Sequence, residues 1–308
     1  MPSPRIVFMG TPDFAVPSLA LLLANHYEVV AVVTAPDKPQ GRGRYILASP
    51  VKRMALAHGL PVLQPTQLSS PTFLATLQAY QADLQVVVAF RVLPKSVWAM
   101  PRLGTINLHA SLLPQYRGAA PIHWAIINGE RETGVTTFFI AQAIDTGHLL
   151  FQECTPIFLQ DTFGTLHERL QHQGAQLLLK TVRAIASNNY SATPQATLPK
   201  DVYKRAPKLY KSDGEINWIQ PSLAILNFIR GLSPYPAAWT YWRGKRYKIL
   251  LATPAPFDKP HLAPGALYVD ESYGLCVGTQ DTPIAIKQLQ PEGKRIMDTS
   301  AFLRGYTI

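Results

Sequence analysis

The alternation of apolar, strand-like runs with helical patterns in the first half of the chain is the feature that most constrains its fold. Strands are predicted at Arg5–Met9, Glu28–Thr34, Leu60–Gln64, Leu84–Phe90, Thr105–Ser111 and Val135–Ala141. Helical patterns are found at Phe14–Ala24, Ser49–His58, Pro71–Ala79 and Ala120–Asn128. Strands that alternate with helices form βαβ units. The first half therefore predicts an α/β fold with a largely parallel sheet, in which ligands bind where loops follow the carboxyl ends of strands.

The second part of the chain predicts a smaller β domain. A long helical pattern at Thr162–Ala186 closes the first domain, and the uncharged polar stretch Ser187–Leu198 indicates a linker. Short strands are predicted at Lys245–Ala252, Gly265–Val269 and Gly274–Gly278, with one helix at Ser222–Gly231. We therefore expect a first domain over residues 1–187, a linker over 188–204 and a small β-barrel-like domain over 205–308.

The charge of the chain is strongly positive and unevenly distributed. Its 308 residues include 29 Lys and Arg against 19 Asp and Glu, a net charge of +10. Residues 1–187 carry an excess of +4, and the shorter stretch 188–308 carries +6. Such a field attracts polyanions, above all nucleic acid. The alternative, that the charge serves only solubility, stays open at this point.

Several classes of protein are excluded by what the sequence lacks. Cys154 and Cys276 lie far apart without metal-ligand spacing, which argues against a disulfide framework and against a metal site. The first apolar run stops at Gly10, too early for a signal peptide. No apolar run approaches the ~18 residues that a transmembrane helix needs. We expect a cytoplasmic protein that does not bind membranes.

Three polar residues stand at the ends of predicted strands. Asn107 and His109 are two apart in one strand, so both side chains lie on the same face. Asp145 follows the next strand. A satisfied core histidine and a turn aspartate are the structural alternatives. If the three side chains converge, the carboxylate stabilises a protonated imidazole, and the amide and imidazolium form a donor pair for an oxyanion.

That arrangement suits acyl transfer to an external amine. The substrate amine is itself the nucleophile in such a reaction, and the sequence contains no G-x-S-x-G elbow and no Cys/His pattern that would supply another one. Catalysis would then depend on positioning and electrostatics without a metal.

Basic residues gather in places that suit contact with RNA. The long loop after the second strand carries Lys38, Arg42 and Arg44 around two glycines. The second domain begins with a basic cluster that includes Lys204 and Arg205, with tyrosines among them. Interleaved basic and aromatic residues suit contact with an RNA backbone. Solvated loops and strand faces are the structural alternative.

Six motifs in order resemble one family of enzymes. They are Gly10–Ala15 (GTPDFA), the Gly41–Gly43 loop (GRG), Asn107–Pro114 (NLHASLLP), Arg117–Ile122 (RGAAPI), Asp145–Gly147 (DTG) and Pro234–Trp239 (PYPAAW). N-x-H-x-S-L-L-P with a downstream D-x-G is similar to the pattern of folate-dependent formyltransferases. The first segment and the GRG loop narrow the resemblance to methionyl-tRNA formyltransferases, over essentially the whole chain.

The resemblance implies a Rossmann-like catalytic domain, with helices on both faces of its sheet, followed by an OB-like domain that helps to hold tRNA. It implies formyl transfer from 10-formyltetrahydrofolate to the α-amino group of methionyl initiator tRNA, by a protein that we expect to be a monomer. Asn107, His109 and Asp145 match the family's catalytic trio, and Arg42 matches the loop arginine at the tRNA acceptor end. The expected folate-contacting residues are Ser111, Leu112, Leu113, Pro114, Phe90 and Arg91.

The chain departs from the family pattern at two positions near the expected folate. Phe90-Arg91-Val92-Leu93-Pro94 is one residue shorter than the usual Y-G-x-x-L-P, and Arg91 replaces a glycine. Ala141-Gln142-Ala143 stands where an acidic residue and a glycine usually precede the catalytic aspartate. Two alternatives therefore remain beside the favoured function: a sugar-nucleotide N-formyltransferase, and a catalytically silent relative that binds tRNA.

Overall fold

The computed structural model describes residues 3–40, 45–195, 203–255 and 262–306. The chain forms two compact units. The first comprises Met1–Gly118, Thr133–Thr155 and His167–Lys204, and the second comprises Ala119–Glu132, Pro156–Leu166 and Arg205–Ile308. Each unit thus takes in stretches that lie apart in the sequence. The boundaries expected near residues 187 and 205 stay a prediction.

The first unit is built on a seven-stranded sheet with the order β10-β9-β7-β6-β1-β2-β5. Its strands are β1 (Ile6–Gly10), β2 (Val29–Val33), β5 (Val62–Leu63), β6 (Leu84–Val88), β7 (Thr105–His109), β9 (Glu132–Phe139) and β10 (Leu149–Pro156). The pairings from β5 through β2, β1 and β6 to β7 are parallel, and β9 pairs antiparallel with β7. The predicted α/β fold with a largely parallel sheet is confirmed.

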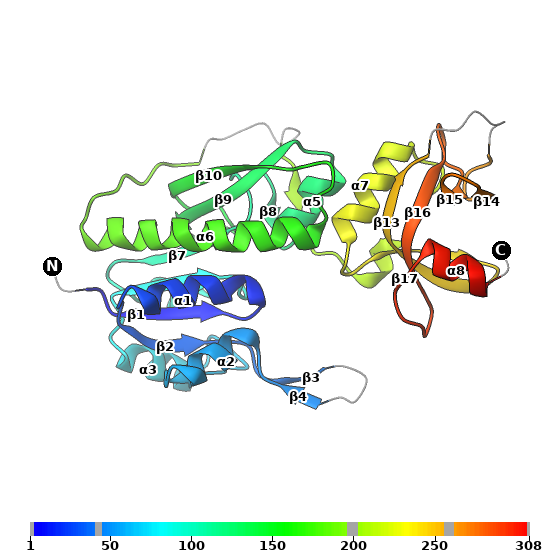
Figure 1. The fold of residues 1–308 in the computed structure, drawn as a ribbon. Helices are drawn as coiled ribbons and strands as arrows, with labels where there is room; N and C mark the ends of the chain where they lie inside the picture. Colours follow the sequence, from blue (N-terminus) through cyan, green and yellow to red (C-terminus); the bar gives the residue numbers. More distant parts are fainter. Residues whose placement is uncertain (1–2, 41–44, 196–202, 256–261, 307–308) are drawn as a thin grey trace. The chain divides into compact units, whose positions relative to one another are not determined.

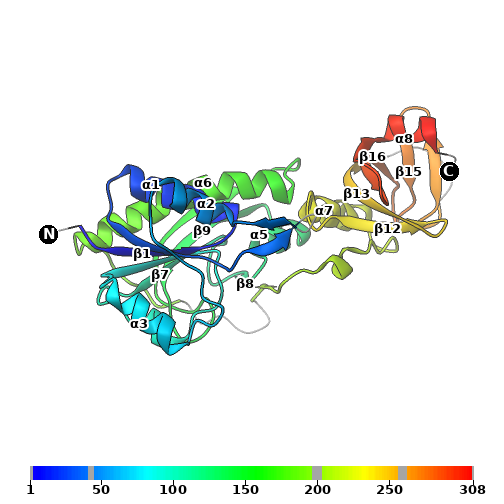
Figure 2. The same ribbon diagram turned by 90° about the horizontal axis from the view of Figure 1, so that it is seen from below.

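Helices cover both faces of this sheet, with α1 and α6 on one side and α3 on the other (Figure 2). The helices are η1 (Asp13–Ala15), α1 (Val16–Ala24), α2 (Pro50–Ala57), α3 (Pro71–Ala79), α4 (Lys95–Trp98) and α6 (Phe163–Ala186). Alternate residues of β1 serve the two faces. Val7 and Met9 join Phe73 and Leu77 of α3 in one buried cluster. Two short hairpin strands, β3 (Lys38–Gln40) and β4 (Tyr45–Leu47), follow β2 (Figure 1).

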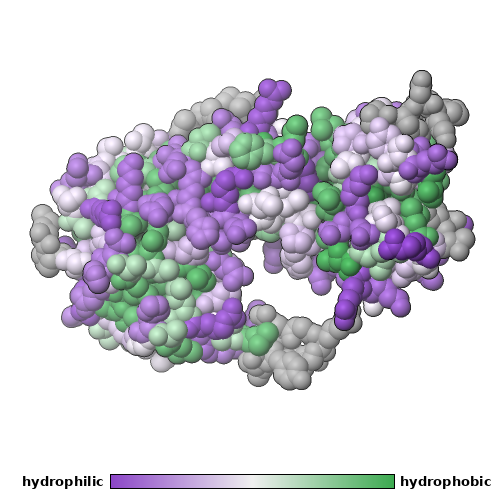
Figure 3. All heavy atoms as spheres, in the orientation of Figure 1, coloured by the Kyte–Doolittle hydropathy of each residue, from purple (hydrophilic) through white to green (hydrophobic). Residues whose placement is uncertain are grey.

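The amphipathic pattern of α6 fixes how this helix lies on the sheet. The exposed positions are Thr165, Glu168, His172, Gln176, Lys180 and Arg183, three or four residues apart, so they form one hydrophilic stripe. This outward face appears as a purple band in Figure 3. On the opposite side, a Cβ at Gly174 would lie 2.9 Å from Leu108 of β7. The glycine therefore permits α6 to approach the strand that carries Asn107 and His109.

The second unit contains a small antiparallel sheet with the strand order β12-β13-β16-β15-β14, and β17 pairs with β16. Its elements are α5 (Pro121–Ile127), η2 (Lys211–Gly214), α7 (Ser222–Leu232), β12 (Ala238–Trp242), β13 (Lys245–Pro254), β14 (Leu267–Asp270), β15 (Gly274–Val277), β16 (Ile284–Pro291), β17 (Met297–Asp298) and α8 (Thr299–Gly305). The two-residue strands β8 (Arg117–Gly118) and β11 (Arg205–Ala206) complete the fold. The predicted small β domain is confirmed. Within the described ranges, no helix has the length and apolarity to cross a membrane.

Asp281 fixes the start of α7 in the second unit. Its carboxylate accepts hydrogen bonds from the backbone N–H groups of Ser222 (2.8 Å) and Thr282 (2.7 Å) and from the Thr279 hydroxyl (2.9 Å). These donors, the Ser222 N–H first, lower the pKa of Asp281 to about 2. Ser222 is the first residue of α7, and Pro221 before it has no side-chain group that could accept a hydrogen bond. Asp281 therefore caps the start of this helix in its place.

We predict that Asp281→Ala lowers the free energy of unfolding of the second unit by about 1 kcal/mol at neutral pH, as loss of a cap does. Because the folded-state pKa of Asp281 is lowered, its stabilisation is present above the unfolded value near 4 and is lost as pH falls towards about 2. The difference between variant and wild type in denaturant unfolding should therefore shrink across that window. Glu271→Ala, in an exposed turn, is the control; a difference independent of pH would contradict the assignment.

Candidate active site

Strand β7 presents Asn107 and His109 on one face of the sheet. Ile106 and Leu108 are buried on the opposite face, which confirms the alternation expected from the sequence. The Oδ1 atom of Asn107 is buried and has no hydrogen-bond partner among the residues that the structure describes. A buried polar atom without a partner costs about 1–3 kcal/mol. This amide is therefore a candidate for contact with a ligand.

Each ring nitrogen of His109 faces an oxygen atom. Nε2 lies 2.9 Å from the carbonyl oxygen of Tyr116. Because a carbonyl only accepts hydrogen bonds, Nε2 carries the proton of the neutral ring. Nδ1 lies 3.9 Å from Oδ2 of Asp145, and the side chains of both residues are about nine-tenths buried. That gap exceeds a hydrogen bond. Nδ1 is thus the ring nitrogen that remains available for a reacting group.

Asp145 is held in an uncommon backbone conformation. Its φ of 54° lies in the left-handed region, which aspartate tolerates better than most residues. The backbone N–H of Gly118 donates to its Oδ2 at 2.9 Å. The structure therefore brings Asp145 and His109 together across the loops that follow β7 and β9, although they are 36 positions apart in the sequence.

The Ser111–Pro114 loop, expected to contact folate, is shaped by two polar residues of the neighbouring strands. The Thr136 hydroxyl on β9 donates to the Ser111 carbonyl at 2.6 Å and accepts from the Leu113 N–H at 3.2 Å. Gln152 of β10 donates to the Leu113 carbonyl at 2.8 Å. Ser111 uses its own hydroxyl within the loop, to the Gln115 carbonyl at 2.7 Å. The loop is therefore anchored to the sheet directly behind His109.

Phe90 and Arg91 follow the carboxyl end of β6, as expected. The Arg91 guanidinium donates to the carbonyl groups of Pro65 (2.7 Å) and Thr66 (3.1 Å), and its Cζ lies 5.3 Å from the centre of the Phe90 ring. The residue that replaces the family's glycine thus joins the β6 loop to the loop between β5 and α3. Its contact with folate stays a prediction.

The residues expected to contact tRNA fall in three groups. Lys38 is exposed on β3, and Lys204 and Arg205 are exposed beyond residue 202. The Lys204 carbonyl accepts from the N–H of Tyr116 at 2.6 Å, so the main chain at Lys204 is tied to the residue that pairs with His109. Arg42 and Arg44 lie outside the described residues.

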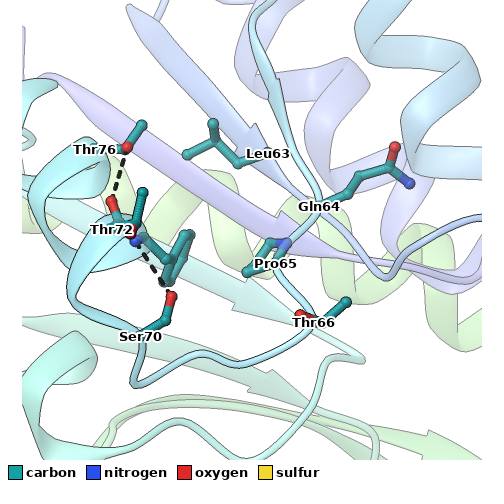
Figure 4. A pocket seen from close by; sticks show the side chains of 8 residues that line it. Leu63, Gln64, Pro65, Thr66, Ser70, Thr72 and Thr76 are labelled. Atoms are coloured by element: carbon teal, nitrogen blue, oxygen red, sulfur yellow. Dashed lines mark hydrogen bonds between the residues drawn. The ribbon is translucent and has the colours of Figure 1, made fainter.

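A separate pocket of about 300 Å³ opens beside α3 (Figure 4). It is lined by Leu63, Gln64, Pro65, Thr66, Ser70, Thr72, Phe73 and Thr76. None of these side chains is a carboxylate, imidazole, amine or thiol, so the pocket offers no general acid or base. Over the described part of the chain, no group of three or more His, Cys, Asp or Glu residues could hold a metal ion. The expectation that no metal takes part stays a prediction.

Comparison with known families matches both units of the chain. A family described as "Formyl transferase" matches residues 4–182, and "Formyl transferase, C-terminal domain" matches residues 208–307. A methionyl-tRNA formyltransferase of Bacteroides fragilis is 48% identical over 98% of this chain and 95% of its own length. One of Porphyromonas gingivalis is 47% identical over 99% of this chain and 96% of its own.

This chain belongs to the methionyl-tRNA formyltransferase family. The recognition made from the sequence motifs is confirmed.

Solved structures of other proteins share this fold. HypX from Aquifex aeolicus, solved with tetrahydrofolic acid, has a TM-score of 0.67 at 18% identity over 98% of this chain and 47% of its own. An N-formyltransferase from Helicobacter canadensis, solved with folinic acid and dTDP-3-aminofucose, has a TM-score of 0.68 at 22% identity over 92% of this chain and 99% of its own. At these identities the likeness concerns the fold alone.

Sequence reasoning missed the groups that orient the candidate catalytic residues. The Tyr116 carbonyl and the Gly118 N–H are backbone atoms, so no residue type announces them. Gln195, whose amide donates to the loop of Asp145, lies in the stretch predicted as a linker. The sequence signal for these groups was the R-G motif at Arg117 and Gly118, because it lies shortly after the strand that carries Asn107 and His109.

Gly147→Ala is predicted to abolish activity, because its Cβ would lie 1.6 Å from the Phe139 carbonyl oxygen and would push the Asp145 loop away from β9. A misplacement of about 1 Å near the chemistry costs about 10²-fold in rate. The measurement is kcat for formyl transfer. Gly305→Ala, where the added Cβ meets open space, is the matched control. Wild-type kcat in Gly147→Ala would show that the loop position is immaterial.

Proposed function

We propose that this chain transfers a formyl group from 10-formyltetrahydrofolate to the α-amino group of methionine on initiator tRNA. The observation that carries the proposal is the buried, unpartnered Oδ1 atom of Asn107 on the same face as the His109–Asp145 pair. The choice of substrate is supported by the names of relatives that are 47–48% identical over nearly their whole length.

The proposed reaction begins when the neutral amine attacks the formyl carbon. A C–N bond forms, and the carbonyl electrons move to the formyl oxygen. The Asn107 NH2 group and protonated Nδ1 of His109 stabilise the oxyanion, while the Asn107 Oδ1 accepts an N–H of the amine. The intermediate collapses by breaking the bond to N10 of the folate. The ring passes its Nδ1 proton to N10, and one proton of the amine returns to Nδ1 through a water held by Asp145.

The remaining parts of the proposal concern partners and location. Folate is held by the Ser111–Pro114 loop with Phe90 and Arg91, the reaction needs no metal, and the protein acts as a cytoplasmic monomer. The support for folate is the anchored loop behind His109. The support for the absence of a metal is the chemistry itself, since an oxyanion with two such donors needs no further electrophile.

A basic and aromatic surface on the second unit supports contact with the tRNA backbone. Trp239 lies opposite Lys248, and Tyr241 opposite Arg246, in the β12–β13 pairing. The residues that alternate with them are buried, namely Ala238, Thr240, Tyr247 and Ile249. Trp239, Tyr241, Arg246 and Lys248 therefore share the opposite, outward face. Burial lowers the pKa of Lys248, and the charges of Lys211 and Arg246 lower it further. Crowded cations of this kind favour a polyanion.

Removing a reacting group should abolish turnover. Asn107→Ala and His109→Ala are each predicted to lower kcat by about 10²–10³-fold, as loss of an oxyanion donor does. Asp145→Asn should also lower kcat, because the carboxylate that holds the water of the proton relay is lost. The assay is formyl transfer from 10-formyltetrahydrofolate to charged initiator tRNA, with an amino-sugar nucleotide as the competing acceptor. His172→Ala, on the exposed face of α6, is the control. Near-normal rates in all three variants, or transfer to the sugar alone, would refute the proposal.

Contact with tRNA should depend on salt and on the basic surface. The double variant Arg246→Ala/Lys248→Ala is predicted to raise KM for tRNA, and to reduce the slope of log KM against log salt by about 1 per lost phosphate contact. KM for the folate should not change. Arg304→Ala, on α8, is the control. Arg42→Ala should likewise weaken the use of tRNA. Unchanged salt dependence in the double variant would remove this face from the interface.

A further inference from the structure

Gln195 occupies a position that no catalytic motif includes. It follows a short antiparallel pairing of Thr193 with Leu149, in which the two backbones exchange hydrogen bonds of 2.8 and 2.9 Å. Residues 193–195 therefore run beside the segment 145–149, which contains the Asp-Thr-Gly motif. We call residues 193–195 the strap segment.

The Gln195 side chain uses its complete hydrogen-bonding capacity at this place. Its NH2 group donates to the carbonyl of Asp145 at 2.8 Å and to that of Gly147 at 2.9 Å. Its Oε1 accepts from Nε of Arg117 at 3.1 Å and from Nη2 of the same guanidinium. Only a neutral amide presents two donors on one side and a double acceptor on the other.

Arg117 fixes which way this amide points. The two guanidinium N–H groups meet a single oxygen, so the amide nitrogen is turned towards the Asp145 loop. The guanidinium lies over the Tyr203 ring, with its Cζ 5.3 Å from the ring centre. The next residue, Gly118, donates its N–H to the Asp145 carboxylate. Arg117 thus holds the main chain of Asp145 through Gln195, and Gly118 holds its side chain directly.

Asp145 needs such restraint because of its backbone conformation. A non-glycine residue in the left-handed region persists only where its surroundings over-determine it. The carbonyl that accepts from Gln195 belongs to the residue with φ of 54°. Release of this carbonyl would let the peptide rotate and carry the carboxylate away from its position 3.9 Å from His109 Nδ1.

We propose that Gln195, oriented by Arg117, is a positioning residue for formyl transfer: it locks the Asp145 loop in the conformation that sets the carboxylate beside His109. The proposal rests on the function given above. It turns part of the predicted linker into a component of the active centre. The Gln195 side chain acts only through Asp145 and makes no contact with the reacting atoms.

The decisive variant is Gln195→Glu, which keeps the shape of the side chain and replaces both donors by oxygen. We expect kcat with saturating folate and Met-tRNA to fall about 10²-fold, the effect of a misplacement of about 1 Å, while KM for each substrate changes less than threefold. Hydrogen exchange of the backbone amides of 141–148 should accelerate about tenfold or more. Thr193→Ala, whose exposed side chain lies in the same strap segment, should leave kcat and exchange as in the wild type.

A double-mutant cycle tests the role of Arg117. Gln195→Ala and Arg117→Ala should each lower kcat, and the double variant should lose little more than Gln195→Ala alone, because both remove one connected lock. Additive losses would overturn the assignment of Arg117. If Gln195→Glu does not fold, Gln195→Leu replaces it as the test variant, because leucine also lacks both amide donors.

Failure of this inference is distinguishable from failure of the proposed function. If the wild type transfers no formyl group to tRNA, the function is wrong, whereas exchange of the 141–148 amides still reports on the lock without any substrate. If the wild type is active and Gln195→Glu keeps its kcat, or if the loop amides exchange as in the wild type, Gln195 is not a positioning residue.

Discussion

The candidate active site depends on holding Asp145 in a left-handed conformation beside His109. Neither residue is placed by its own element alone, since His109 ends β7 and Asp145 lies in a loop beyond β9. The meeting requires β9 to run antiparallel against β7, Gly147 to approach the end of β9 without a side chain, and Gly118 to offer its N–H to the carboxylate. The strand pairing, the glycine and the backbone donor together hold Oδ2 of Asp145 3.9 Å from Nδ1 of His109.

The same arrangement decides which atom of His109 can act. The Tyr116 carbonyl engages Nε2, so Nδ1 alone faces the carboxylate. The gap between them is too long for a direct hydrogen bond. In a buried site less solvent screens electrostatic interactions, so a hydrogen-bond donor aimed at a developing oxyanion acts more strongly there than in water.

The sequence predicted the elements well where periodicity was strong and less well where it was interrupted. The predicted helix Pro71–Ala79 coincides with α3, since Ser70 caps its start and Pro71 suits the first turn. Strand β10 was missed because half of its residues are exposed and its apolar run ends at Phe151. Strand β16 was missed because Lys287 and Gln288 interrupt its alternation, although its buried residues lie in the core of the second unit. Apolar patterning reports burial, and it fails for strands at an edge or with mixed faces.

The sequence by itself determined the α/β class, the family, and the candidate trio Asn107, His109 and Asp145, since these depend on local periodicity and on motifs of short spacing. Only the tertiary structure decided which groups orient them. The lock formed by Gln195 and Arg117 joins residues 78 positions apart, and the partner of His109 Nε2 is a backbone carbonyl. Such contacts depend on how loops fold over the end of a sheet. A one-dimensional pattern carries no information about that geometry, because hydrogen bonds to main-chain atoms require only proximity and direction.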